Sequence, residues 1–147
     1  MQIQKLTATD VLLARALFPM MAQVFSEPCD ELSDAYLQGL LGRESFWAFA
    51  ALAEEQVVGG LTGYLLPMTR RETHELFIYD VAVREDYQRR GVGRALMRAA
   101  IQAANGIGAQ NAFVPADAED DHALRFYRAL GGTAAESTIF TFPNVTP

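Results

Sequence analysis

Residues 88–95 hold the sequence's most chemically suggestive pattern, Gln-Arg-Arg-Gly-Val-Gly-Arg-Ala. They follow an apolar run over residues 79–83 and open a helix predicted over residues 91–105. A helix N-terminus offers unpaired N–H groups and the positive end of a dipole. Glycine lets an anion approach the backbone, and arginine suits phosphate. The pattern therefore predicts a diphosphate site, whereas the alternative is a glycine-capped helix with solvated arginines.

Two other phosphate-binding motifs do not fit this stretch. A P-loop ends in Gly-Lys-Ser or Gly-Lys-Thr, but here Gly93 is followed by Arg94 and Ala95. The dinucleotide fingerprint needs a third glycine, and Leu96 stands at that position.

Asp80 is a carboxylate within the otherwise apolar run of residues 77–83. On a regular strand it would share a face with Ile78 and Ala82. Because a carboxylate in a sheet is costly unless it is paired or lies at a wet cleft, Asp80 has two interpretations. It either binds a substrate amine or joins a base relay, or it forms a structural ion pair or belongs to a β-bulge.

A second acidic group follows the strand predicted over residues 111–116. Its members are Asp117, Glu119, Asp120 and Asp121. We expect them to form an acidic wall for a polycation, with helix capping by Asp120 or Asp121 as the alternative. Asp117 is the leading candidate for a general base, and His122 is its rival because a histidine pKa suits that task. A further acidic set at positions 27, 30, 31 and 34 is interpreted as capping and solvation.

Composition limits the classes of function. The chain has 147 residues and a net charge of −6, which argues against general binding to nucleic acid or a membrane surface. Cys29 is the single cysteine, so no internal disulfide forms, and the two histidines give no metal-ligand spacing. No apolar run approaches the ~20 residues that span a bilayer. We expect one cytoplasmic domain over residues 1–147.

Apolar periodicity predicts an α+β fold. We expect strands at 3–6, 46–53, 56–66, 75–83, 111–116 and 137–142. Helices are expected after Asp10, where Pro19 should kink or end the helix, after Ser33, over 91–105, and around 123–130. The order βααβββαβαβ gives a mixed, largely antiparallel sheet with helices on its faces.

This order and the Gln-x-x-Gly-x-Gly motif resemble the GCN5-related N-acetyltransferases (GNAT). The resemblance implies a splayed cleft for acetyl-CoA. The pantetheine arm would pair with the backbone of Val81, Ala82 and Val83. The pyrophosphate would lie on the N–H groups of Arg89, Arg90, Gly91, Val92, Gly93, Arg94 and Ala95. In the run Ala-x-x-Phe-Tyr-x-x-Leu-Gly, Tyr127 would protonate the leaving thiolate; without the resemblance it would be a core tyrosine.

Further runs resemble the type I aminoglycoside 3-N-acetyltransferases over roughly residues 33–131, but little before residue 30. They include Phe-Trp-Ala-Phe-Ala-Ala-Leu-Ala at 46–53 and Ala-Asp-Ala-Glu-Asp-Asp at 116–121. This resemblance implies acetylation of the 3-amino group of 2-deoxystreptamine, with Asp80 and the acidic wall binding the cationic aminoglycoside. The alternatives are acetylation of a small polyamine or protein amine, and a non-catalytic acyl-CoA sensor. The sheet edge and the final strand also make a homodimer plausible.

Overall fold

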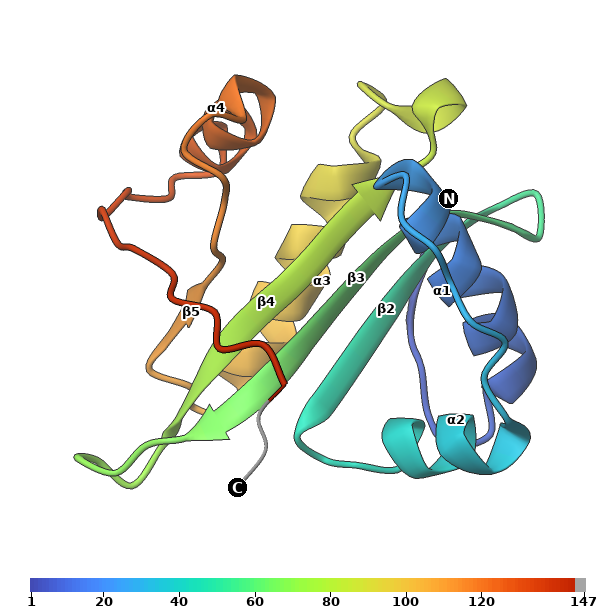
Figure 1. Ribbon diagram of the computed structural model, residues 1–147, viewed down its shortest axis with the longest axis horizontal. Coiled ribbons are helices and arrows are strands. Elements are labelled where there is room, and N and C mark those ends of the chain that lie inside the picture. Colours follow the sequence, from blue (N-terminus) through green and yellow to red (C-terminus); the bar gives the residue numbers. More distant parts are fainter. Residues whose placement is uncertain (145–147) are drawn as a thin grey trace. The chain divides into compact units, whose positions relative to one another are not determined.

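One five-stranded sheet organises the chain, in the strand order β1-β2-β3-β4-β5 (Figure 1). The computed structural model describes residues 1–144. The strands are β1 (Gln2–Lys5), β2 (Phe46–Ala53), β3 (Gln56–Pro67), β4 (His74–Val83) and β5 (Asn111–Phe113). The first four pair antiparallel in sequence order, and β5 pairs parallel to β4. The predicted α+β class and the largely antiparallel sheet are confirmed.

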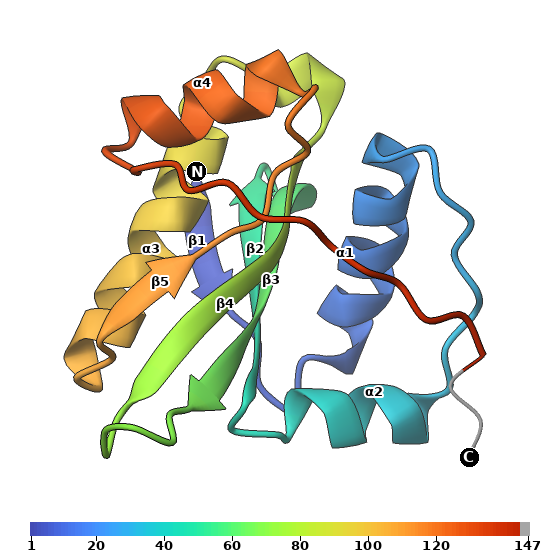
Figure 2. The same ribbon diagram turned by 60° about the vertical axis from the view of Figure 1, so that its left-hand side comes forward.

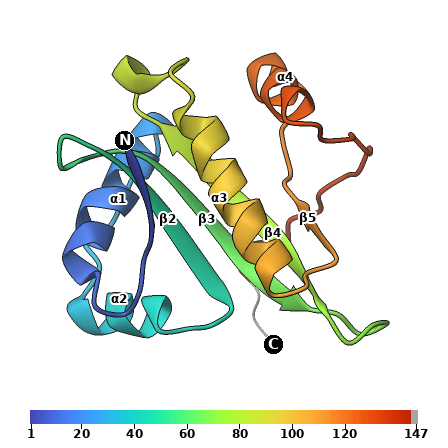
Figure 3. The same cartoon turned by 180° about the vertical axis from the view of Figure 1, so that it is seen from behind.

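Helices cover both faces of this sheet (Figure 2). α1 (Val11–Val24) and α2 (Asp34–Leu41) lie on one face and α3 (Val92–Gly106) on the other, as the view from behind also shows (Figure 3). Two adjacent glycines of β3 permit this packing. A Cβ on Gly60 would lie 2.4 Å from Leu17 of α1, and one on Gly59 would lie 2.9 Å from Val92 of α3. Successive strand residues point to opposite faces, so each glycine admits one helix.

The core lies between the sheet and its helices. β2 is buried from Phe46 to Ala51, as expected for a strand covered on both faces. Ser33 caps α2, because its Oγ accepts the Tyr36 N–H at 3.1 Å. On α3 the buried side belongs to Val92, Leu96, Met97, Ala100 and Ala104.

Of the two outcomes predicted at Pro19, a kink or an end of the helix, the end is wrong, because α1 passes through this residue. It continues five residues further, to Val24. Proline removes one hydrogen bond from a helix interior. Ala14, Leu17 and Met21 are buried at helical spacing on both sides of Pro19. We attribute the survival of the helix to this burial, which tethers both halves to the sheet.

The chain divides into two compact units, residues 1–115 and 116–147, and each is described by itself. The second unit contains α4 (Asp121–Ala129) followed by irregular chain. The strand predicted at 137–142 is wrong for the described residues: no strand forms there, and Ile139, Phe140 and Phe142 are 76–78% exposed. A strand requires a pairing partner as well as an apolar pattern. No helix among residues 1–144 is long and apolar enough to cross a membrane.

Candidate functional site

A β-bulge in β4 sets the direction of the Asp80 side chain. The register shifts so that Thr62 pairs with Asp80 while Gly63 pairs with Ile78, leaving Tyr79 as the extra residue. Thr62 lies two residues after Gly60, so Asp80 is on the α1 face. Ile78 lies on the α3 face. The predicted shared face of Asp80 and Ile78 is therefore wrong. Asp80 does flank a β-bulge, and this bulge turns its side chain to the α1 face without excluding that it binds an amine.

The edge of β4 beside β5 is open over its second half. The parallel ladder has three pairs and ends at Phe77 and Phe113, whereas β4 runs on to Val83. β5 was expected to reach residue 116 but stops at 113. Among residues 1–144 no strand pairs with this side of residues 78–83, so Val81, Ala82 and Val83 offer backbone groups to an extended partner.

The loop from β4 to α3 ends in a residue with left-handed backbone. Gly91 is the N-cap of α3 with φ +82°, and a Cβ placed on it would meet nothing within 4 Å. The first intrahelical bond that the helix start makes is Ala95 N–H to the Gly91 carbonyl, at 3.0 Å. The N–H groups of Val92, Gly93 and Arg94 precede it and have no partner in the helix. The Ala95 N–H is therefore not available to a diphosphate, whereas the N–H groups of Val92, Gly93 and Arg94 remain available.

The side chains around this loop hold its shape and leave it cationic. Gln88 donates from Nε2 to the Val83 carbonyl at 3.0 Å, which ties the loop to the end of β4. Arg84 pairs with Asp86 at 2.6 Å and is neutralised. Arg89, Arg90 and Arg94 are exposed, and within residues 1–144 they form no ion pair. Together with the helix dipole they favour an anion at this loop.

Asp80 is a half-buried carboxylate in an acidic environment. Loss of solvent raises the pKa of Asp80, and the negative charge of Glu27 raises it further. The ion-pair alternative fails among the described residues, where the ion pairs join Arg15 to Asp34 and Arg84 to Asp86. An ionised Asp80 would therefore be stabilised by a cation from outside the chain.

Aromatic side chains lie beside Asp80 on the same face. Tyr64 is next to Tyr79 with ring centroids 5.9 Å apart, and Phe77 stacks on Phe113 at 5.0 Å. Burial raises the pKa of Tyr64, and the charges of Tyr79, Tyr36 and Asp80 add to that effect. These rings are not among the residues predicted for the site. Phe77 and Tyr79, two residues apart on a predicted strand, were the feature of the sequence that could have indicated an aromatic surface.

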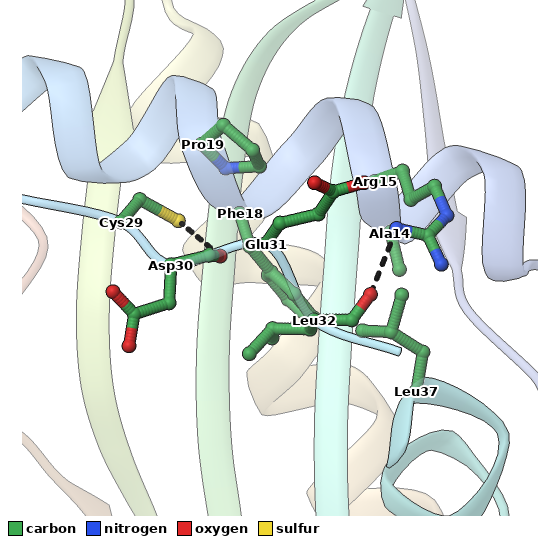
Figure 4. A pocket seen from close by; sticks show the side chains of 9 residues that line it. All are labelled: Ala14, Arg15, Phe18, Pro19, Cys29, Asp30, Glu31, Leu32 and Leu37. Atoms are coloured by element: carbon green, nitrogen blue, oxygen red, sulfur yellow. Dashed lines mark hydrogen bonds between the residues drawn. The ribbon is translucent and has the colours of Figure 1, made fainter. Parts of the chain in front are cut away.

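The loop between α1 and α2 is held by Arg15. Arg15 donates to the Leu32 carbonyl at 2.8 Å (Figure 4). It also pairs with Asp34. Between helix and loop lies a cavity of about 370 Å³. It is lined by Ala14, Arg15, Phe18, Pro19, Cys29, Asp30, Glu31, Leu32 and Leu37. Arg15 therefore anchors the segment that carries Glu27.

In the second unit, two of the four predicted acidic residues have structural partners. Asp120 accepts the Ala123 N–H at 3.0 Å and caps α4, as the capping alternative states. Asp117 accepts the Glu119 N–H at 2.9 Å. Glu119 and Asp121 are exposed. Tyr127 is half-buried on α4 and packs edge-on against Phe126 at 5.1 Å.

The first unit therefore combines an open strand edge with a helix start that favours an anion, and the helix start follows the end of the same strand. The model of the acetyltransferase (GNAT) family matches residues 13–131, and the chain belongs to this family. A search of curated proteins finds no match.

Crystal structures of aminoglycoside acetyltransferases from uncultured soil metagenomic samples are similar to the chain. For meta-AAC0020 in complex with trehalose, identity is 35% and the TM-score is 0.90, covering 99% of this chain and 96% of that one. For the same enzyme in complex with sisomicin, the identity is 34% and the TM-score is 0.91, with the same coverage of both chains. For HMB0005 the identity is 32% and the TM-score is 0.92, and the alignment covers 97% of both chains. The aminoglycoside acetyltransferase AAC(6')-Iy in complex with CoA is 18% identical with a TM-score of 0.81, which shows a shared fold.

Proposed function

We propose that the chain is an acetyl-CoA-dependent aminoglycoside N-acetyltransferase. The observation that carries the proposal is the 34% identity over nearly the whole chain to an acetyltransferase crystallised with sisomicin. An acidic, aromatic face beside an anion-binding helix start supports it. The face suits a cationic acceptor, and the helix start suits a diphosphate.

Acetyl-CoA fits the residues present. Its diphosphate would be held by Gly91, the N–H groups of 92–94 and the three exposed arginines, and its pantetheine arm by the backbone of 81–83. When bound it supplies an activated acetyl thioester: the acceptor nitrogen forms the new C–N bond, and the C–S bond breaks. The chain's own tasks are to bind the acceptor, accept its proton, and protonate the thiolate.

We assign these tasks to three residues. Asp80 binds an acceptor ammonium, because its half-buried carboxylate forms no ion pair with any residue from 1 to 144. Asp117 accepts the proton from the acceptor amine, directly or through water. Tyr127 donates a proton to the thiolate. Glu119, Asp120 and Asp121 add negative potential for a polycation, with Asp120 also capping its helix.

The finer proposal concerns which amino group is acetylated and what this does to the drug. The resemblance of residues 46–53 and 116–121 to type I aminoglycoside 3-N-acetyltransferases favours the 3-amino group of 2-deoxystreptamine. Acetylation there removes one positive charge from the drug, and we propose that the chain thereby confers resistance in the cytoplasm. We also propose a homodimer, since residues 139, 140 and 142 expose large apolar side chains. Light scattering after size exclusion tests the homodimer.

Thiol release from acetyl-CoA tests the function. Purified protein is offered sisomicin, gentamicin, spermine and a peptide with a free amine. Turnover is expected with the aminoglycosides. Turnover with spermine or the peptide alone would establish the alternative acceptor class, and tight acetyl-CoA binding without turnover on any amine would favour a sensor.

A further inference from the structure

Exposed aromatic rings gather on the sheet face that α1 and α2 leave partly uncovered. Tyr64 is 37% exposed, Tyr79 57%, Phe113 41%, and Tyr36 at the start of α2 57%. Tyr64, Phe77, Tyr79 and Phe113 form a connected row of ring contacts along β3, β4 and β5, which we call the aromatic row. Large exposed rings on one surface of a soluble protein mark a binding surface.

Tyr64 is the best-supported ring of this row. Its centroid lies 5.5 Å from Phe46, 6.4 Å from Phe77 and 5.9 Å from Tyr79. Phe46 is itself in contact with Phe18 of α1 at 6.4 Å. These rings restrict the rotation of Tyr64, so a ligand that binds it meets a surface that is already ordered.

The charge beside the aromatic row is negative. The β-bulge places Asp80 and Tyr79 on the same face as Tyr64. Glu27 contributes further negative potential at Asp80, and Arg15 anchors the loop that carries it. The Tyr64 phenol is neutral near pH 7, and burial raises its pKa further, so its ring is an uncharged π-surface with a hydroxyl. A cation with an apolar body complements this combination.

We propose that Tyr64 is a specificity-determining residue of the acceptor site: its ring packs against the ring of an amine-bearing sugar or cyclitol while Asp80 binds the ammonium. The proposal rests on the proposed function and names a feature of its acceptor, a cation carried on a ring. An ammonium or its adjacent CH groups gain from an aromatic face. A linear polyamine has no ring to place there and loses more conformational freedom when it is bound.

Calorimetry with the full-length protein tests the proposal without requiring turnover. The ligands are sisomicin, whose amines are carried on rings, and the linear polyamine spermine. The variants are Tyr64→Leu, Tyr64→Phe and the control Leu66→Ala, which shortens another exposed side chain of β3. Melting temperature and acetyl-CoA affinity confirm that each variant is folded.

Tyr64→Leu is expected to weaken sisomicin binding about 3–30-fold. Spermine binding should change less than about twofold, and Tyr64→Phe and Leu66→Ala should bind sisomicin like the wild type. Equal losses for both ligands, no loss for sisomicin, or an equal loss in Tyr64→Phe would overturn the proposal.

Turnover of sisomicin by the wild type is measured separately. Binding without acetylation, with the expected ranking of variants, would refute the proposed function but support the acceptor surface. Absence of sisomicin binding to the wild type would overturn the acceptor surface.

Discussion

Replacing Gly91 by alanine separates backbone strain from obstruction of the proposed diphosphate site. Gly91 has φ +82°, and a Cβ there meets no atom of residues 1–144 within 4 Å. The substitution therefore costs left-handed strain, about 1–2 kcal/mol, without a clash inside the protein. For a chain of this size that lowers the melting temperature by about 2–8 °C. Alanine is preferred to valine because valine would add β-branched strain at the same φ.

The same helix supplies a matched control. Gly108 follows the C-terminal end of α3 with φ +74° and also has open space around its Cβ position. α3 has 15 residues, so the two glycines are separated by at least about 22 Å. Gly108→Ala should lose about as much melting temperature as Gly91→Ala, but it places no methyl group near the helix start.

Acetyl-CoA affinity then distinguishes the two variants. Calorimetry should show binding at least about tenfold weaker in Gly91→Ala, equivalent to about 1.4 kcal/mol, and unchanged in Gly108→Ala. Equal affinity in the two variants would refute the assignment of the diphosphate to this loop. Both variants carry the same kind of backbone strain, and only Gly91→Ala places a methyl group at the start of α3.

Further variants test the other assignments. Tyr127→Phe should lower kcat about 10²-fold with little change in acetyl-CoA affinity, and unchanged turnover would remove it from the mechanism. Asp117→Asn keeps a side-chain oxygen that accepts the Glu119 N–H, so the expected fall in kcat would report the lost carboxylate charge. Unchanged kcat would mean that Asp117 only stabilises the turn. Asp80→Asn should melt higher than wild type at pH 7 yet bind sisomicin more weakly. Because folding raises the pKa of Asp80, the carboxylate penalises the fold at neutral pH, and the gain should disappear below pH about 4; a lower melting temperature at pH 7 would contradict this. Gly60→Ala should lose about 1–3 kcal/mol in denaturant unfolding because its Cβ meets Leu17, whereas Gly39→Ala, with open space on α2, should not; equal stabilities would contradict the packing.

Local patterns predicted most elements of the first unit. Alternation and continuous apolar runs located β2, β3 and β4, and Ser33 identified the start of α2 by its capping side chain. The glycines at 59 and 60 admit Val92 of α3 and Leu17 of α1 on opposite faces of β3. These features depend on neighbours in sequence.

Features that depend on distant partners were not predictable. The face of Asp80 follows from a bulge opposite Thr62 and Gly63, which no local pattern reveals. The segment at 137–142 has the composition of a strand but pairs with nothing among residues 1–144. Pro19 remains helical because the residues around it are buried against the sheet. The proximity of Glu27 to Asp80 likewise arises from folding.

The site of acetylation on sisomicin is the decisive measurement for the proposed function. Sisomicin is incubated with acetyl-CoA and the purified protein, and the product is examined by mass spectrometry and NMR. We expect one added acetyl group, on the 3-amino group of the 2-deoxystreptamine ring. The proposed function would be contradicted if sisomicin stayed unmodified while the protein bound acetyl-CoA and acetylated an amine of another compound.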